Sequence, residues 1–290
     1  MKVLVTGASG TVGGLVTRRL SEEGVAVRGV VRRPESAADL RQRELPEVEA
    51  VAADLAEEAG VPELLAGVDA VFLVTANVPT QLAQEQSVIR AAAKAGVRRV
   101  VKISVGGVSP DAPLALARVH YAAEQELTVV GVPHTILRPA FFMDNLLQYI
   151  PWIDPSGRLE LPLGDGAMGM IDARDIADVA VAELRASAGG DRDLVLTGPE
   201  DLTTAQALAR IADVVGRPLR HVDGMRESFL RRYLADGNWS GYAEDMATLY
   251  DGVLRHGYGA GTTATVEEVT GHAPRTVDDF AFEHAGKFSR

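Results

Sequence analysis

The stretch MKVLVTGASGTVGG, residues 1–14, sets the fold class of this chain. Its apolar beginning is typical of a central parallel strand that is buried on both faces. The turn that follows has the glycine spacing G-x-x-G-x-x-G. Gly7 permits the tight turn, Gly10 lets a pyrophosphate approach the backbone, and Gly13 lets the next helix pack closely. That helix begins with free amides and a positive dipole end toward the phosphates, so the stretch predicts a dinucleotide-binding turn.

The alternative for this motif is a structural turn without a ligand. A glycine motif alone is weak evidence, but here an apolar strand precedes it and an amphipathic helix follows. The apolar side of that helix carries Val12, Leu15, Val16 and Leu20. This context favours the nucleotide site over the structural turn.

Composition narrows the classes of function. The chain has 290 residues, is 47% hydrophobic and contains no cysteine, so disulfides, thiolate metal sites and a cysteine nucleophile are excluded. Its formal net charge of −11 argues against nucleic-acid binding, because phosphate contact needs a basic surface. No apolar run approaches the length of a membrane span, and the six histidines show no metal-ligand spacing. We expect a cytoplasmic protein with no nucleic acid, membrane or metal as partner. The sequence leaves the oligomeric state open.

Strands alternate with helices through the first half of the chain. Strand patterns lie at residues 1–6, 25–31, 48–52, 70–75, 100–104 and 134–138. Helical patterns at 82–95 and 114–130 end at glycines. This alternation predicts right-handed crossovers and a doubly wound parallel sheet, the α/β Rossmann fold. We expect a nucleotide-binding domain over 1–138 and a smaller, mostly helical substrate lobe over 139–290, with part of 171–197 a candidate to return to the main sheet.

The second half reads differently. Residues 151–169 are rich in proline and glycine and predict a loop. Helical patterns follow at 174–186, 204–215, 226–236 and 241–256, with a strand pattern at 193–197.

The cofactor site is expected at the glycine turn and at the strand ends, because ligands of parallel sheets bind beyond the carboxyl ends of the strands. The residues expected there are Thr6, Gly7, Ser9, Gly10, Thr11, Val12, Gly13, Arg32, Arg33, Asp54, Leu55, Thr75, Ala76 and Ser104. Asp54 is placed to meet the adenine. Its rival role is to cap the next helix, and the two roles are compatible.

Two arginines indicate which nicotinamide cofactor is used. Enzymes that use NAD usually carry an acidic residue at the end of the second strand, where it holds the ribose hydroxyls. Here that strand ends in Arg32 and Arg33, with no carboxylate before Glu35. A guanidinium binds a 2′-phosphate through paired hydrogen bonds, whereas a carboxylate repels it. The pair favours NADP(H). The alternative is that both arginines are surface charges on a loop.

Several stretches resemble the NmrA-like atypical short-chain dehydrogenases. They are residues 6–14, HYAAE at 120–124, TILRPAFFMDN at 135–145, IDARDIA at 171–177 and LTGPE at 196–200. Within the family the chain is similar to the triphenylmethane reductase and type 2 quinone oxidoreductase branch, over nearly its whole length. The resemblance implies a Rossmann domain, bound NADP(H) and a cleft under a small C-terminal lobe. Family members reduce quinones or dyes, act in biosynthetic pathways, or sense the redox state of the nucleotide without catalysis.

The chain departs from ordinary short-chain dehydrogenases in one respect. Those enzymes resemble each other in a Tyr-x-x-x-Lys pair, in which the lysine lowers the tyrosine pKa from about 10. Here Tyr121 is followed four residues later by Gln125. Alcohol–ketone chemistry is therefore disfavoured. A strong hydride acceptor such as a quinone needs less acid assistance, because the cofactor carries the hard step. A non-catalytic sensor fits the missing lysine equally well.

Three side chains are candidates for catalysis at the nicotinamide end: Ser104, His120 and Tyr121. His120 could donate a proton near neutral pH, and Glu124, four residues later on one helix face, could orient its imidazole. The alternative is a helix-start histidine that hydrogen-bonds only the loop. Tyr121 competes with apolar neighbours for the buried face of its helix.

Candidate substrate contacts follow the sixth strand. They are Phe141, Phe142, Met143 and Asn145. Aromatic and thioether surface suits a flat, apolar molecule. The alternative for each of the four is ordinary core between the two lobes. The sequence as a whole predicts an NADPH-dependent oxidoreductase that reduces a flat conjugated small molecule, such as a quinone or a polyaromatic carbonyl. Two rival functions stay open: a non-catalytic NADP(H)-sensing regulator, and a non-redox biosynthetic enzyme on the same fold.

Overall fold

The computed structural model describes residues 1–43, 45–186 and 190–288, and it divides the chain into two compact units. The first unit comprises Met1–Ala112, Ala117–Arg138 and Ile176–Leu194. The second comprises Pro113–Leu116, Pro139–Asp175 and Val195–Arg290. Among the described helices, none is both long enough and apolar enough to cross a membrane.

The first unit is built on a seven-stranded sheet of order β3-β2-β1-β4-β5-β6-β9. Its strands are β1 (Lys2–Val5), β2 (Ala26–Val31), β3 (Val48–Ala52), β4 (Ala70–Leu73), β5 (Arg99–Ile103), β6 (His134–Pro139) and β9 (Arg192–Leu196). All neighbours from β3 to β6 pair in parallel. The chain reverses its direction of winding between β1 and β4, so the crevice beyond these two strands is the topological switch point. The predicted Rossmann architecture is confirmed.

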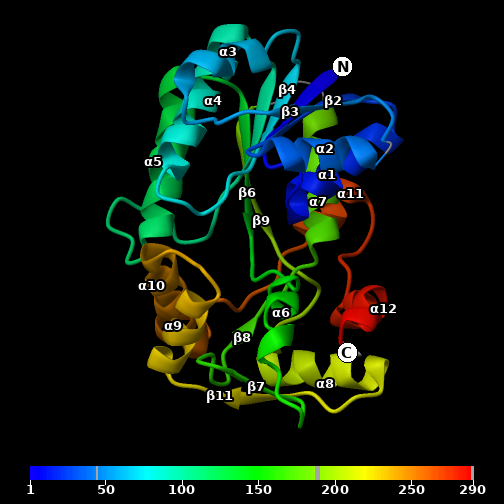
Figure 1. Ribbon diagram of the computed structural model, residues 1–290, viewed down its shortest axis with the longest axis vertical. Coiled ribbons are helices and arrows are strands. Elements are labelled where there is room, and N and C mark those ends of the chain that lie inside the picture. Colours follow the sequence, from blue (N-terminus) through cyan, green and yellow to red (C-terminus); the bar gives the residue numbers. More distant parts are fainter. Residues whose placement is uncertain (44, 187–189, 289–290) are drawn as a thin grey trace. The chain divides into compact units, whose positions relative to one another are not determined.

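Helices cover both faces of this sheet. They are α1 (Thr11–Glu22), α2 (Pro34–Gln42), α3 (Val61–Leu64) after the 3₁₀ turn η1 (Glu58–Gly60), α4 (Gln81–Ala95), α5 (Ala115–Val130) and α7 (Ala173–Arg185). Figure 1 shows α3, α4 and α5 on one face of the sheet and α1, α2 and α7 on the other. Strands β4 and β5 are therefore buried along their whole length, which explains their continuous apolar runs.

The second unit is mostly helical and carries two small sheets. Its elements are α6 (Asn145–Gln148), η2 (Ile150–Trp152), β7 (Arg158–Leu161), β8 (Ala167–Met168), β10 (Leu202–Thr203), α8 (Thr204–Val215), β11 (Arg220–Asp223), α9 (Arg226–Ala235), α10 (Ser240–Thr248), the π-helical η3 (Leu249–Val253), η4 (Leu254–His256), α11 (Thr265–Thr270) and α12 (Val277–Phe288). Strand β7 pairs in parallel with β11, and β8 pairs antiparallel with β10.

Two local expectations for this unit were wrong. The segment 151–169 contains β7 and β8 rather than loop alone, because its apolar side chains alternate with polar ones in Arg158–Leu161 and find a partner strand far along the chain. The pattern at 241–256 is not one α-helix. It runs from α10 through a π-helical turn into a 3₁₀ turn, and the π turn places Tyr250 in the buried core of the unit.

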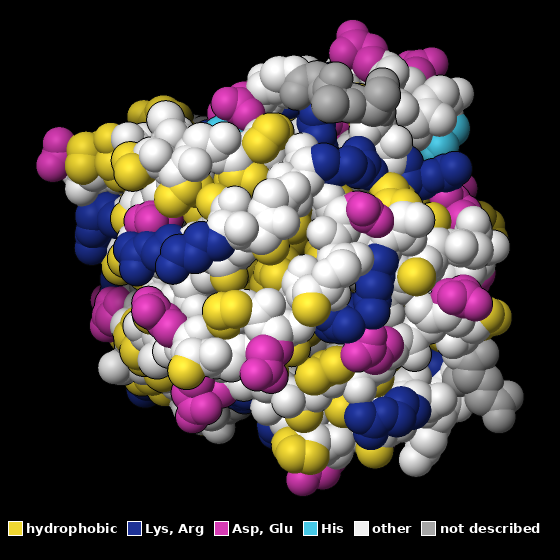
Figure 2. All heavy atoms as spheres, turned by 90° about the horizontal axis from the view of Figure 1, so that it is seen from above, with side chains coloured by type: hydrophobic (Ala, Val, Ile, Leu, Met, Phe, Trp, Pro, Cys, Tyr) yellow, Lys and Arg dark blue, Asp and Glu magenta, His cyan; other side chains and the backbone are white. Residues whose placement is uncertain are grey.

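Figure 2 shows one face of the molecule with Lys and Arg side chains interspersed among Asp and Glu side chains. On this face no continuous basic stripe forms among the described residues.

Candidate functional site

The glycine turn after β1 has a backbone that only glycine accommodates at two positions. Gly7 has φ +58°, and a Cβ atom on it would lie 3.0 Å from the carbonyl oxygen of Val74. A Cβ atom on Gly13 would lie 2.2 Å from the carbonyl oxygen of Gly7. The N-cap of α1 is Gly10, and no side chain caps the first amides of this helix. Those amides are available to an anion.

Thr6 supports the turn from behind. It is fully buried, and its Oγ1 donates to the carbonyl oxygen of Val74 at 2.7 Å and accepts from the Val74 amide at 2.8 Å. The Ala8 amide donates to the carbonyl oxygen of Val30 at 3.2 Å. The turn is thus fastened to β4 on one side and to β2 on the other. Thr6 was expected among the cofactor contacts, and its hydroxyl is committed to the backbone.

The groups left open around the turn are polar or cationic. Ser9, Gly10 and Thr11 are exposed, and Val12 and Gly13 are buried. Arg32 and Arg33 are exposed, and neither forms an ion pair with another described residue.

The polar side chains at the ends of β3 and β4 have different hydrogen-bond partners. The Oδ1 atom of Asp54 accepts a hydrogen bond from the Ala56 amide at 2.9 Å and so closes a turn. The helical turns that follow have Glu57 and Gly60 at their N-caps, so the expectation that Asp54 caps the next helix was wrong. Leu55 is buried. After β4, Thr75 is half-buried and its hydroxyl donates to Oε1 of Glu85 at 2.8 Å, while Ala76 is exposed. The carbonyl oxygen of Ala76 accepts from the Val78 amide at 2.9 Å, and its side chain is exposed.

A buried ionic cluster lies between β5, α4 and α5. Lys102 has no exposed surface, and its Nζ atom lies 3.1 Å from Oε2 of Glu85. The same Nζ donates to the carbonyl oxygen of Ile103 at 2.9 Å and to Nδ1 of His120 at 2.8 Å. Gln81 joins the cluster through its Nε2 atom, which donates to Oε1 of Glu85 at 3.3 Å. Burial of a charge requires such partners.

The contacts of this cluster determine the tautomer and the protonation state of His120. Because an ammonium only donates, Nδ1 must be the accepting nitrogen, and the single ring proton of the neutral imidazole is then on Nε2. Burial, and after it the positive charges of Lys102 and Arg138, hold the pKa of His120 well below its ordinary value of 6.5. The imidazole is therefore neutral at physiological pH.

Ser104 belongs to a second cluster, at the ends of β5 and β6. Its hydroxyl donates to Oε1 of Glu124. Arg138 binds both oxygens of Glu124, at 2.8 and 2.9 Å, and Asp193 from the other side at 2.7 Å. Glu124 was expected to orient His120. It is instead held by Ser104 and Arg138, because a guanidinium offers a bidentate partner.

Tyr121 is the most accessible of the three candidate catalytic side chains. Its residue is half-buried, whereas Ser104 and His120 are buried. Its hydroxyl forms no hydrogen bond with another described residue. The hydroxyl is therefore not committed to a partner within the described part of the chain.

In the second unit, the predicted substrate contacts differ in burial. Met143 is 1% exposed and belongs to the core of the unit. Phe141 is half-buried with its ring centroid 5.9 Å from that of Tyr250, and Phe142 is half-buried where its backbone bridges to Ile171. Asn145 begins α6, and its Oδ1 accepts from Gln148 at 3.2 Å. Phe141, Phe142 and Asn145 keep exposed surface.

Comparison with known proteins identifies the family. The model of the NAD(P)H-binding family matches residues 7–187. The chain belongs to this family. It is 36% identical to the NAD(P)H azoreductase of Xenophilus azovorans, over 99% of both chains. It is 38% identical to the (4-alkanoyl-5-oxo-2,5-dihydrofuran-3-yl)methyl phosphate reductase of Streptomyces griseus, again over 99% of both chains. Its fold is similar to that of the NADPH-dependent quinone oxidoreductase QOR2 of Escherichia coli in complex with NADPH, with a TM-score of 0.82 and 25% identity, covering 98% of this chain and 99% of that one.

These similarities confirm the expected NAD(P)H-binding reductase family, with azo and quinone reductases among the proteins that the chain resembles. The protein is an NAD(P)H-dependent oxidoreductase. In this NAD(P)H-binding chain the uncapped start of α1 and the open side of the glycine turn fit a pyrophosphate, because both offer free backbone amides. The nicotinamide chemistry is the transfer of a hydride.

Three functional candidates were missed by sequence reasoning: Lys102, Glu85 and Gln81. A signal for the first was present, because Lys102 interrupts an otherwise apolar central strand, VVKI, and a buried lysine needs a counter-charge. No local signal indicated which carboxylate would supply it.

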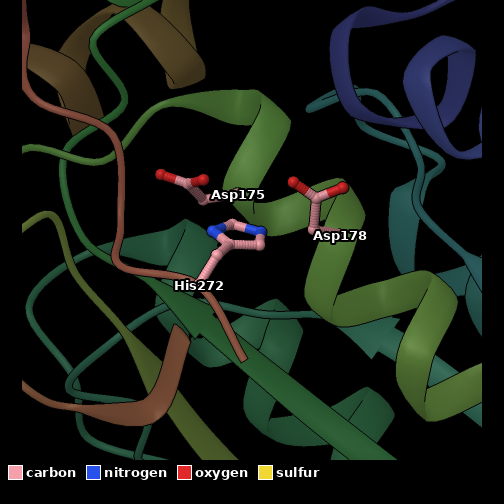
Figure 3. A group of neighbouring side chains, drawn as sticks. All are labelled: Asp175, Asp178 and His272. Carbon is pink, nitrogen blue, oxygen red and sulfur yellow. The ribbon is translucent and has the colours of Figure 1, made fainter. Parts of the chain in front are cut away.

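Two aspartates and a histidine form a further group of potential metal ligands. Figure 3 shows Asp175 and Asp178 projecting from successive turns of α7, with His272 from the segment after α11. Arg275 donates to Asp175 from its backbone amide at 2.7 Å and from its guanidinium. Asp178 forms an ion pair with Arg19 at 2.6 Å. Both carboxylates are already neutralised, so we assign no metal to them.

Proposed function

We propose that this reductase transfers hydride from NADPH to a flat, conjugated acceptor: a quinone, an azo compound or an acyl dihydrofuranone. The observation that carries the proposal is that two of the three candidate acids, His120 and Ser104, are engaged inside the first unit, which leaves only the Tyr121 hydroxyl or water to supply a proton. His120 is neutral, and the Ser104 hydroxyl donates to Glu124. Conjugated acceptors delocalise the charge that hydride addition creates, and so they need little acid assistance.

The relatives support this class of substrate. Their names describe an azoreductase, a reductase of an acyl dihydrofuranone phosphate and a quinone oxidoreductase. The three acceptors share an electron-poor conjugated system rather than a common skeleton. We infer that the same electronic property, not one molecular shape, defines the acceptors of this chain.

The preference for NADPH over NADH rests on charge. Arg32 and Arg33 are exposed at the end of β2, and no carboxylate precedes Glu35 there. A 2′-phosphate would receive charge-assisted hydrogen bonds from these guanidinium groups. The neutral 2′-hydroxyl of NADH would be a much weaker hydrogen-bond partner for these guanidinium groups.

Backbone and side-chain groups of the site would divide binding and proton transfer between them. The first amides of α1 bind the pyrophosphate, and Ser104 and the backbone after β4 hold the nicotinamide end. Tyr121 or water supplies the proton that completes reduction, and His120 positions α5 against β5 through Lys102. Phe141, Phe142 and Asn145 contact the acceptor. The hydride would carry both electrons to the acceptor, the proton would complete the addition, and NADPH would be left as NADP⁺.

The test is a panel of acceptors assayed by the loss of nicotinamide absorbance. Menadione, methyl red and an acyl butenolide represent conjugated acceptors, and acetophenone and cyclohexanone represent simple ketones. We expect turnover with at least one conjugated acceptor and a kcat/KM at least about 100-fold lower with the ketones. Equal rates with both classes would overturn the proposed mechanism. Tight NADPH binding without turnover of any acceptor would favour the redox-sensing alternative.

A further inference from the structure

A third arginine lies beside the glycine turn, in addition to the two at the end of β2. The Nη1 atom of Arg43 is 3.7 Å from the place that a Cβ atom on Gly14 would occupy. The same place lies 3.6 Å from the carbonyl oxygen of Ala8 and 4.0 Å from the carbonyl carbon of Ser9. The guanidinium therefore stands next to the turn, on the side where Gly14 has no side chain.

The packing of α2 explains how Arg43 reaches this position. Leu40 is buried, and its Cδ2 atom lies 3.0 Å from the place of a Cβ atom on Gly29, which in turn lies 3.1 Å from Cβ of Ala8. The face of α2 that carries Leu40 thus meets β2 and the turn. Arg43 follows Leu40 by three residues and shares this direction.

Two other charged residues of α2, Arg41 and Asp39, do not share the direction of Arg43. Arg41 points toward β3, where its Nη2 donates to the carbonyl oxygen of Ala50 at 2.7 Å. Asp39, four residues before Arg43, is spaced for a helical ion pair. In the described part of the chain no such pair forms, and Arg43 is exposed. Its guanidinium is directed at the turn and keeps donors for a ligand.

We propose that Arg43 is a third cation of the 2′-phosphate site and determines, with Arg32 and Arg33, the preference for NADPH. The inference rests on the proposed NADPH preference and adds a residue from a different element. Arg32 and Arg33 would approach the phosphate from the end of β2, and Arg43 from the end of α2 along the turn. Ser9, which is exposed and lies beside the same Gly14 position as Arg43, would offer a hydroxyl to the phosphate.

Gly14 has a specific part in this arrangement. A methyl group at position 14 would make only ordinary contacts, at 3.6 Å or more, so the backbone does not require glycine there. A longer side chain would occupy the space beside the turn that the Arg43 guanidinium uses. Gly14 therefore keeps a path open between Arg43 and the nucleotide.

The test compares the binding of 2′,5′-ADP and 5′-ADP by titration calorimetry, because these probes differ only in the 2′-phosphate. For Arg43→Met we expect affinity for 2′,5′-ADP to fall about tenfold, the loss typical of one charge-assisted hydrogen bond, with 5′-ADP nearly unchanged. The matched control is Arg18→Met. Arg18 is an exposed arginine one turn beyond Gly14 on α1. Its replacement measures how much one positive surface charge near the turn changes affinity through long-range electrostatics alone.

Substitutions at Gly14 test independently whether Arg43 needs the space beside the turn. Gly14→Ala should bind both probes like the parent protein, and Gly14→Leu should lose affinity for 2′,5′-ADP selectively. The double variant Arg32→Met/Arg33→Met separates this inference from the proposed function. If the double variant loses the preference for 2′,5′-ADP while Arg43→Met keeps it, Arg43 is not part of the site and the NADPH proposal stands. If the parent protein itself binds both probes equally, the NADPH proposal fails and the inference about Arg43 fails with it.

Discussion

The Nζ atom of Lys102 lies 2.8 Å from Nδ1 of His120, and both residues are buried in the interior of the first unit. Lys102 also lies 3.1 Å from Glu85, whose carboxylate accepts the Thr75 hydroxyl at the end of β4. One ammonium therefore links β5, α4 and α5 directly beneath the strand ends that line the switch point. This link makes Lys102 a positioning residue for the site and a strong determinant of stability.

Removal of this ammonium should destabilise the protein severely. Lys102→Met leaves the Glu85 carboxylate buried without its counter-charge, and breaking a buried pair in this way typically costs about 3–5 kcal/mol. The free energy of unfolding, measured by urea denaturation, should show this loss. The double variant Lys102→Met/Glu85→Gln should recover much of it. Lys94→Met is the control, because Lys94 is exposed and should shift stability by no more than about 0.5 kcal/mol. A double variant no more stable than Lys102→Met would contradict the ion-pair explanation.

The depressed pKa of His120 predicts how stability depends on pH. The folded protein holds this histidine neutral, whereas the unfolded chain takes up a proton below about pH 6.5. The unfolded state then binds more protons, so stability falls as the pH decreases through this value and is constant above it. At one pH unit below 6.5 the contribution of His120 is about 1.4 kcal/mol.

Urea denaturation at pH 7.5 and pH 5.5 measures this dependence. His120→Gln should reduce the difference between the two conditions, and His256→Gln, at an exposed histidine, should leave it unchanged. An unchanged pH dependence in His120→Gln would mean that the imidazole is protonated in the folded protein.

The sequence predicted the fold because the fold depends on local chemistry. Gly7 and Gly13 stand where a Cβ atom meets backbone, and the central strands are apolar because helices cover both faces. Strand and helix bounds agree with the predicted ones to within about two residues, apart from the second unit. The parallel pairing of β7 with β11 escaped prediction, since their partners lie about 60 residues apart in the chain.

The site was predicted less completely, for a different physical reason. Helical spacing places Glu124 beside His120, but β6 presents Arg138 to Glu124, and β5 presents Lys102 to His120. Which of several compatible partners a charged group selects depends on tertiary register, which one helix pattern does not contain. The arginine that ends α2 was also missed, because its approach to the turn depends on how Leu40 packs.

The glycine turn should tolerate no side chain at Gly13. A methyl group there would lie 2.2 Å from the carbonyl oxygen of Gly7, so Gly13→Ala must shift the start of α1 or the turn. We expect lost NADPH binding together with reduced stability. Gly10→Val should abolish NADPH binding while the fold is retained, because branched atoms would occupy the approach of the pyrophosphate.

Calorimetry of NADPH binding and thermal unfolding by circular dichroism distinguish these outcomes. Gly106→Ala is the control, because no described atom lies within 4 Å of its added methyl group. Unchanged NADPH affinity in a folded Gly10→Val protein would remove the glycine turn from the nucleotide site.

Activity measurements should separate the accessible phenol from the buried imidazole. Tyr121→Phe removes only a hydroxyl that has no partner among the described residues, so the fold and NADPH affinity should be unchanged. With a quinone the loss in kcat should be below about tenfold, because water can protonate the reduced oxygen. With a less activated acceptor the loss should approach the 10²–10⁴-fold that is typical of general acid catalysis.

His120→Gln gives the matching comparison. If His120 acts only through Lys102 and the packing of α5, its replacement should lower stability and affect all acceptors to the same extent. A dependence on the acceptor, larger for the less activated one, is instead the signature of proton donation in the transition state. Such a dependence in His120→Gln and not in Tyr121→Phe would assign the proton to the imidazole, in spite of its burial.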